Sequence, residues 1–167
     1  MKKMLPFETR RDIYLSFILP HFEYCSESWH FCNKAASEKL EKVNERAVRL
    51  VFRDKATAYT ELVKKLNLST LENLRLDKIL LSVFKTINNT GAPQSLKELI
   101  TYRDTKYNLR GNKIISIPKA KTTTYGLKSW RYLAAKLWNS LPDNLRTIKD
   151  FRDFKRKLCN IDLTSTQ

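Results

Sequence analysis

The stretch GLKSWRYLAAKLWNSLPDNLRTIKDFRDFKRKLC, residues 126–159, predicts two helices separated by a stop. Its first part places apolar residues at i, i+3, i+4, i+7 and i+8, which is the spacing of one helix face. Pro142 disfavours helical geometry at Leu141, so the first helix should end there. The apolar face consists of Trp130, Leu133, Ala134, Leu137 and Trp138.

A second helix should begin at Thr147, because Thr147 and Asp150 have the spacing of a capping box. Apolar residues would face inward along this helix: Ile148, Phe151, Phe154 and Leu158. Its cations would point outward or to the flanks, which gives an aromatic anchor with a cationic rim: Lys149, Arg152, Lys155, Arg156 and Lys157.

The composition limits the class of protein. A chain of 167 residues that is 42% hydrophobic can bury one sizeable core, so we expect one or two small domains. Three glycines are too few for a phosphate-cradling loop or a turn-rich β architecture. Three irregularly spaced cysteines favour a reducing compartment, and we expect them to be small buried residues.

The net charge of +15 is the strongest signal in the composition. Residues 101–167 contain 15 Lys or Arg against 5 Asp or Glu, whereas residues 1–100 contain 17 against 12. Such a charge is easier to hold in a compact fold when a polyanion neutralises it. We therefore expect RNA or DNA as the partner, bound mainly by the last third of the chain.

No membrane-spanning or secretory segment is expected. The apolar run from Ile13 to Pro20 is far shorter than the roughly 20 residues that cross a bilayer. The sequence predicts a soluble intracellular protein, nuclear or cytoplasmic.

The remaining periodicity predicts a mostly α-helical fold. Helices are expected over residues 7–31 with a break at Pro20, 37–52 with Ser37 as N-cap, 59–66, 69–87 with Ser69 as N-cap, and 95–100. In the second of these the buried stripe should be Leu40, Val43, Ala47, Val48, Leu50 and Val51. The predicted organisation is a small helical bundle over 7–100, a basic linker or loop over 101–125, a Trp-rich helical pair over 126–160, and a tail over 161–167.

Residues 21–32 are rich in aromatic and potential metal-binding side chains. The aromatic residues could stack on bases, but core packing is the commoner use of such residues and is our expectation for Phe22, Tyr24, Trp29 and Phe31. The spacings of His21, Cys25, His30 and Cys32 do not form the paired units of a zinc site, so no metal is expected.

Residues 101–124 have no helical period and are strongly basic. A short edge strand from Lys113 to Ile117 is one alternative for part of this segment, since Pro118 would confine it to an edge. The segment is either a loop that tracks nucleic acid or a solvated linker.

No catalytic constellation occurs in the sequence. It has no Gly-rich phosphate loop, no HExxH or GxSxG motif, and no closely spaced acidic pair for two-metal chemistry. We therefore predict a binding or structural element without catalytic residues or a cofactor.

Five stretches in order resemble the carboxy-terminal region of reverse transcriptases of non-LTR retrotransposons of the jockey and LINE type. They are IYLSFILPHFEYCSESW, SEKLEKVNERAVRLVF, LNLSTLENLRLDKILLSVFKTINNTGAP, LRGNKIISIPKAKTTTYG and WRYLAAKLWNSLPDNLRTIKDFRDFKRKL, the last with a WNSLP signature. The resemblance implies the thumb and post-thumb helices, which help to hold template RNA and target DNA. The same polyprotein would contain the polymerase palm, which carries the RNA-directed DNA polymerase activity of the family. The paired aspartates of the palm do not occur in this sequence, so no catalytic residue of the family carries over.

The resulting hypothesis is non-catalytic nucleic-acid binding by a basic surface. The expected phosphate contacts are Arg110, Lys113, Lys119, Lys121, Arg152, Lys155, Arg156 and Lys157, with Trp29, Trp130 and Trp138 as structural anchors. Two alternatives remain open: a helical protein-interaction module anchored by Trp130 and Trp138, and a truncated element copy without function.

Overall fold

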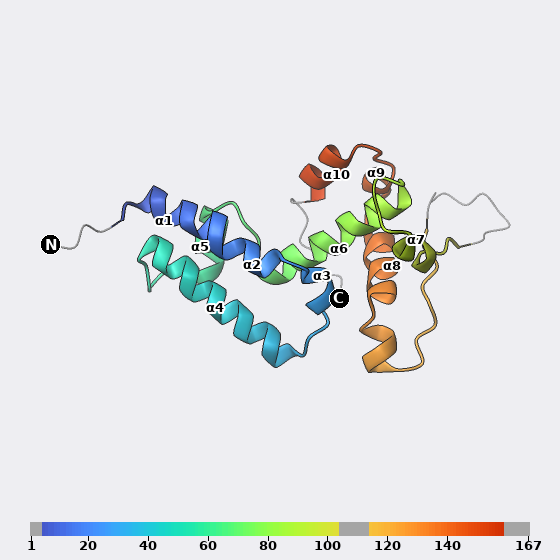
Figure 1. Cartoon of the computed structure of the whole chain (residues 1–167), viewed down its shortest axis with the longest axis horizontal. Helices are drawn as coiled ribbons and strands as arrows, with labels where there is room; N and C mark the ends of the chain where they lie inside the picture. The colour runs from blue at the N-terminus through green and yellow to red at the C-terminus, as the bar shows by residue number, and fades with distance from the viewer. Residues whose placement is uncertain (1–4, 104–113, 159–167) are drawn as a thin grey trace. The chain divides into compact units, whose positions relative to one another are not determined.

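A computed structural model describes residues 5–103 and 114–158. The chain is mostly helical, as the sequence predicts, and it divides into two compact units, Met1–Arg75 (unit 1) and Leu76–Gln167 (unit 2) (Figure 1). The division falls inside one helix, α6 (Leu71–Ile87). The boundaries expected at residues 100 and 125 remain predictions.

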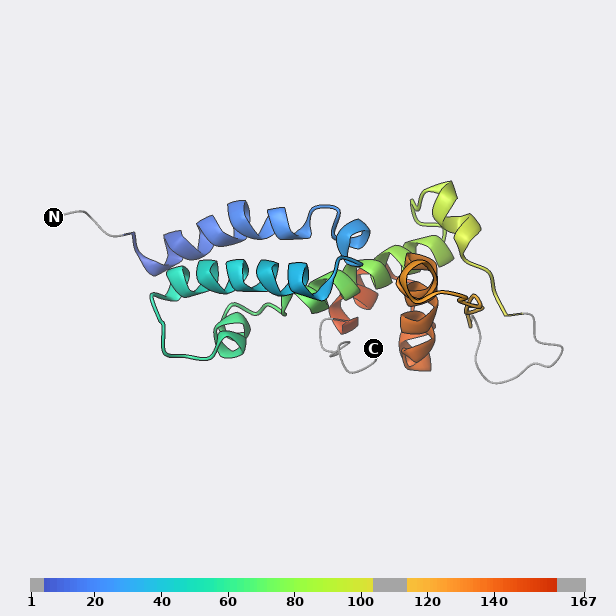
Figure 2. The same ribbon diagram turned by 90° about the horizontal axis from the view of Figure 1, so that it is seen from below.

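Unit 1 is built on two long helical runs that lie side by side and antiparallel (Figures 1 and 2). Phe7, at the start of the first run, and Phe52, at the end of the second, have ring centroids 5.2 Å apart. The elements are α1 (Phe7–Ile13), η1 (Tyr14–Ile18), α2 (Leu19–Glu23), α3 (Ser26–Trp29), α4 (Lys34–Phe52), α5 (Tyr59–Lys65) and the start of α6.

Pro20 does not end the first run, because the chain widens into a π-helical turn just before it. Over Tyr14–Ile18 the hydrogen bonds lengthen by one residue, and the Leu19 N–H donates to the Tyr14 carbonyl. A proline lacks an N–H and crowds the carbonyl four residues earlier, and a π-turn changes the geometry at that point. Helical backbone therefore continues through α2 to Glu23.

The sequence suggested Ser37 as the N-cap of α4, but the N-cap is Asn33. The Asn33 side chain accepts a hydrogen bond of 2.7 Å from the Ala36 N–H. The Ser37 hydroxyl instead accepts one of 2.9 Å from the Arg75 guanidinium. The N-cap of α6 shifts in the same way, since the Asn73 N–H lies 3.4 Å from the hydroxyl of Thr70 and not of Ser69.

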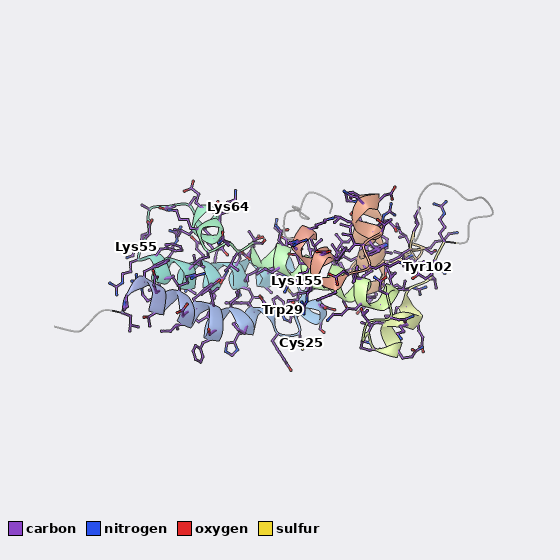
Figure 3. All side chains as sticks on the ribbon, turned by 90° about the horizontal axis from the view of Figure 1, so that it is seen from above. Cys25, Trp29, Lys55, Lys64, Tyr102 and Lys155 are labelled. Atoms are coloured by element: carbon purple, nitrogen blue, oxygen red, sulfur yellow. The ribbon has the colours of Figure 1, made fainter. Side chains whose placement is uncertain are left out.

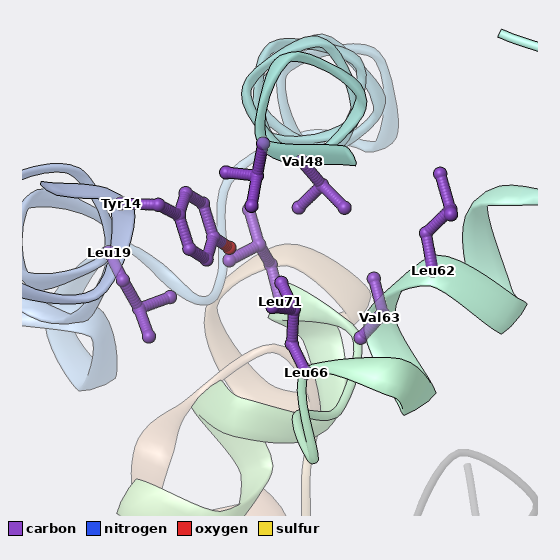
Figure 4. Packing of buried hydrophobic residues seen from close by; sticks show 8 residues of the cluster. Tyr14, Leu19, Val48, Leu62, Val63, Leu66 and Leu71 are labelled. Carbon is purple, nitrogen blue, oxygen red and sulfur yellow. The ribbon is translucent and has the colours of Figure 1, made fainter. Parts of the chain in front are cut away.

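The buried face of α4 also differs from the predicted stripe. Val48 and Val51 are buried, but Val43 is 51% and Leu50 is 73% exposed, and the polar Asn44 is only 2% exposed. The inward face is therefore rotated towards Asn44. Figure 4 shows the apolar core that this face covers, with the ring of Tyr14 from η1 pointing into it. The buried members of this core are Tyr14, Leu19, Val48, Val51, Leu62, Val63, Leu66 and Leu71.

Asn44 is buried because it forms the middle of a hydrogen-bond chain. The Tyr14 hydroxyl donates to the Asn44 Oδ1 over 2.9 Å, and the Asn44 Nδ2 donates to the Tyr59 hydroxyl over 2.8 Å. The Tyr59 hydroxyl donates to the Glu41 carboxylate over 2.8 Å, and the Leu71 N–H lies 3.3 Å from the same Glu41 oxygen. Burial raises the pKa of Tyr14 to about 12, and burial together with the Glu41 carboxylate raises the pKa of Tyr59. Both phenols therefore stay neutral hydrogen-bond donors.

The turn before α3 corrects two further expectations. Tyr24 is 77% exposed and not a core residue, and Cys25 is exposed with a left-handed φ of 48°. Cys32, Phe22, Trp29 and Phe31 are half-buried. Figure 3 marks Cys25 and Trp29 at this turn, where the Trp29 indole N–H donates to the Tyr24 carbonyl over 3.0 Å.

Unit 2 begins with the apolar stripe of α6, which is buried as predicted from Leu76 to Phe84. It continues through α7 (Gln94–Leu99), η2 (Thr123–Leu127), α8 (Trp130–Ser140), α9 (Asp143–Arg146) and α10 (Phe151–Leu158). In place of the strand considered for 113–117, the described residues show one antiparallel bridge between Tyr102 and Ile115. The Asn139 side chain ties this bridge to α8, because it accepts from the Ile115 N–H (2.9 Å) and donates to its carbonyl (2.8 Å).

The Asn44 network generates a first prediction. Asn44→Leu leaves the buried Tyr14 hydroxyl without its acceptor and removes the donor to Tyr59, which keeps only its bond to Glu41. A buried unpaired polar group costs about 1–3 kcal/mol. We expect the free energy of unfolding, measured by urea denaturation, to fall by about 2–4 kcal/mol. The reciprocal variant on the same helix, Leu50→Asn, should change it by less than about 0.5 kcal/mol because Leu50 is exposed. The opposite ranking of the two variants would show that the predicted stripe is correct.

Asp77, a half-buried residue of α6 in unit 2, generates a second prediction. Burial raises the pKa of its carboxyl to about 7. The folded chain therefore holds this proton more tightly than the unfolded chain, and the stability should fall as the pH rises from about 4 to about 7. Asp77→Asn removes this loss, so the variant should be more stable than the parent by about 1–2 kcal/mol near pH 8 and similar to it near pH 4.

Urea denaturation at the two pH values tests this, with Asp12→Asn as the control. Asp12 is exposed on α1 and loses little hydration on folding. A difference between Asp77→Asn and the parent chain that does not change with pH would contradict the prediction.

Candidate nucleic-acid interface

The basic helix α10 begins later than the sequence indicated. Thr147 ends α9, and its hydroxyl donates to the Asp143 carbonyl over 3.1 Å. The cap of α10 is Asp150, whose carboxylate accepts a hydrogen bond of 2.9 Å from the Asp153 N–H. The two residues of the predicted capping box therefore lie at different helix ends: Thr147 is the C-cap of α9, and Asp150 caps the start of α10.

Aromatic packing holds α10 in unit 2. The Phe154 ring stacks on Phe84 of α6, with centroids 4.4 Å apart and an interplanar angle of 21°. The Trp138 ring of α8 lies 6.0 Å from Phe154, and Phe154, Trp138 and Leu158 are all at most 1% exposed. Phe151, beside them, is half-buried with the Lys85 ammonium 5.0 Å from its ring centroid. A helix of eight residues is too short to be stable alone, so these contacts fix its orientation.

The opposite side of α10 carries exposed cations. Arg152 and Arg156 are one helical turn apart and point away from the buried Phe154, while Lys155 and Lys157 flank them. Lys155 is marked on this helix in Figure 3. Arg156 forms an ion pair of 2.6 Å with Asp153, and its side chain is still 76% exposed. We call Arg152, Lys155, Arg156 and Lys157 the α10 basic face.

Two other predicted phosphate contacts, Lys119 and Lys121, are exposed in the segment that leads to η2. Arg110 and Lys113 lie outside the described residues. The η2 turn precedes α8, whereas α10 follows α9 beyond the other end of α8 (Figure 1). The eleven residues of α8, about 16 Å in length, therefore lie between the η2 turn and the segment that leads to α10.

Two exposed cations near η2 in the sequence were not among the predicted phosphate contacts. Lys128 at the end of η2 and Arg131 in the first turn of α8 are both exposed. The signal for them was the absence of acid: residues 105–142 contain eight Lys or Arg and no Asp or Glu. We call Lys119, Lys121, Lys128 and Arg131 the η2 basic group.

The three tryptophans have different surroundings. Trp138 is fully buried, and Trp130 is half-buried with an indole N–H that has no hydrogen-bond partner within the described residues. Trp29 is half-buried in unit 1, with the Arg75 guanidinium carbon 5.1 Å from its ring centroid. Burial and the charge of Arg75 lower the pKa of the neighbouring His30 to about 4.

The described residues 5–103 and 114–158 contain no group of three or more His, Cys, Asp or Glu side chains that could hold a metal ion. Within the same residues no helix has the length and apolar character to cross a membrane. Comparison of the chain with protein-family models, with curated proteins and with solved structures gives no match.

The aromatic stack generates a third prediction. Phe154→Ala removes the ring that contacts both Phe84 and Trp138, and such a truncation in a core costs about 3–5 kcal/mol. We expect a loss of this size in urea denaturation, together with faster hydrogen exchange of the α10 amides. Phe17→Ala is the matched control, since Phe17 is 69% exposed. Equal effects of the two variants would contradict this account of α10.

Proposed function

We propose that this chain is a non-catalytic element that binds the phosphate backbone of RNA or DNA through unit 2. The observation that carries the proposal is the charge of this unit, whose sequence contains 18 Lys or Arg against 7 Asp or Glu. Two groups of its cations, the α10 basic face and the η2 basic group, are exposed to solvent.

The arrangement of these cations suits a sequence-independent contact. Their side chains are long and exposed, and the packing of α10 uses only its apolar residues, so a phosphate backbone can displace counterions without disturbing the core. A strand that follows both groups would therefore contact several phosphates at once.

We further propose that the element has the role implied by the resemblance to non-LTR retrotransposon reverse transcriptases, the holding of nucleic acid beside a polymerase palm. The order of the five stretches supports this, and the basic surface of unit 2 is consistent with it. No polymerase chemistry is proposed for these residues, since no two aspartates are adjacent in the sequence. The rest of a reverse transcriptase polyprotein would then be a second partner.

A protein-interaction module remains the second candidate, although without Trp138 as an anchor. Trp138 is fully buried and cannot contact a partner. Unit 1 instead exposes Phe17, Val43 and Leu50. Binding through such apolar side chains would change little with ionic strength, whereas phosphate binding weakens steeply.

The salt dependence of binding is the fourth prediction and tests the proposed function. Replacing all four residues of the α10 basic face by Gln should weaken binding to duplex and single-stranded oligonucleotides by about 10-fold or more, regardless of sequence. The slope of log K against log salt should become shallower by about 3, since each phosphate contact contributes roughly 0.7–0.9. Fluorescence anisotropy at several salt concentrations measures both quantities.

A matched control removes the same charge from unit 1. Lys34, Lys39, Lys42 and Arg46 are exposed on α4, where acidic residues are interleaved with them. Their replacement by Gln should leave the slope nearly unchanged. The assignment to α10 would be refuted by an unchanged slope in the α10 variant, and equal slopes in both variants would indicate attraction by net charge alone.

A further inference from the structure

Tyr125 is the most exposed large apolar or aromatic side chain in the described part of the chain. Its exposure is 88%, although a tyrosine ring is a large apolar surface. It lies in η2 within the η2 basic group, and no Asp or Glu occurs from residue 105 to residue 142. An exposed aromatic ring among cations without acids is the combination that single-stranded nucleic-acid binding uses.

The backbone that carries Tyr125 is held in place by local contacts. The N–H groups of Gly126 and Leu127 donate to the Thr122 carbonyl over 3.2 and 3.1 Å. The Ser129 hydroxyl donates to the Gly126 carbonyl over 2.7 Å and also caps α8 by accepting from the Tyr132 N–H. These bonds join the η2 turn to the first turn of α8.

Gly126, which follows Tyr125, allows the backbone of Lys121 to lie close to the η2 turn. A Cβ atom at Gly126 would lie 2.8 Å from the Ala120 Cβ, which is closer than real contacts allow, and 3.5 Å from the Lys121 backbone nitrogen. The chain at 120–121 can approach this closely only because residue 126 has no side chain. Lys121 therefore lies on the backbone segment adjacent to Tyr125, and Lys128 follows Tyr125 by three residues.

We infer that Tyr125 is a stacking platform for an unpaired base, with Lys121 and Lys128 contacting the phosphates on either side of that base. The inference rests on the proposed function and narrows its ligand to single-stranded nucleic acid or to an unpaired segment. Bases inside a duplex are already stacked on one another, so their faces are not available to the ring. Every base has a π-face, so the contact would not depend on sequence.

The unit 1 residue Tyr24 provides a natural comparison. Its ring is 77% exposed, close to the value for Tyr125, but its neighbours in the sequence include the acids Glu23 and Glu27. No Lys or Arg occurs from residue 12 to residue 33, so the chain around Tyr24 offers no cation for a phosphate, and an exposed ring alone should not bind a base.

The test is the affinity of Tyr125→Ala for a single-stranded oligonucleotide and for the duplex of the same sequence, measured by fluorescence anisotropy at one salt concentration. The variant should bind the single strand about 10-fold more weakly and the duplex as tightly as the parent chain. Tyr125→Phe keeps the ring and should behave as the parent chain. Tyr24→Ala should leave both affinities unchanged. The double variant Lys121→Gln, Lys128→Gln should lower the affinity for the single strand and for the duplex by the same factor.

An oligonucleotide made of abasic sites separates stacking from charge, since it keeps the phosphates but offers no base. The parent chain should bind it about as weakly as Tyr125→Ala binds the normal single strand. If Tyr125→Ala lowers single-strand and duplex affinity equally, or lowers neither, the stacking platform is refuted and backbone binding by unit 2 stands. If the parent chain binds neither nucleic acid, the proposed function fails and this inference fails with it.

Discussion

The hydrogen-bond chain through Asn44 is the constraint on which unit 1 depends. It joins η1, α4 and α5, and the Glu41 carboxylate extends it to the first N–H of α6. Apolar side chains tolerate small sliding of one helix along another, because dispersion contacts have no direction. A buried amide between two phenols does not, because each displaced bond leaves a polar group without a partner. The network therefore fixes the rotation of α4 about its axis, and this rotation decides which of its apolar residues are exposed.

Unit 2 separates the residues that stabilise it from those that give it its charge. Phe154 and Leu158 attach α10 to the core, and the α10 basic face takes no part in that packing. Positive charges on one surface repel each other and lower stability, so a fold that carries them needs a core that does not depend on them. The stack on Phe84 and Trp138 meets this need, and it leaves the cations exposed to solvent.

The sequence predicted the helices well and their surroundings less well. Helical periodicity predicted α6, α8 and α10, and Pro142 predicted the end of α8, because these signals are local and repeated. The short elements η2 and α9 were not predicted. Caps were misplaced where two candidates lie close together, as with Asn33 and Ser37, since both have side chains that can cap. Asn44 was missed because its partners lie 30 and 15 residues away, so nothing in its own helix marks it as buried. In the candidate interface the exposure of the α10 cations follows from their helix, whereas an isolated ring such as Tyr125 belongs to no periodic pattern.

The π-turn over Tyr14–Ile18 has a consequence for chains related to this one by descent. A π-turn contains one residue more than an α-turn, so a regular helix can take up one inserted residue by forming such a turn. Because the turn takes up the extra residue, α1 before it and α2 after it can keep their apolar faces directed towards α4. A related chain without the turn would be one residue shorter in the middle of this helix. Aligned with the present chain, it would need a one-residue gap inside a helix, a place where gaps are usually treated as errors.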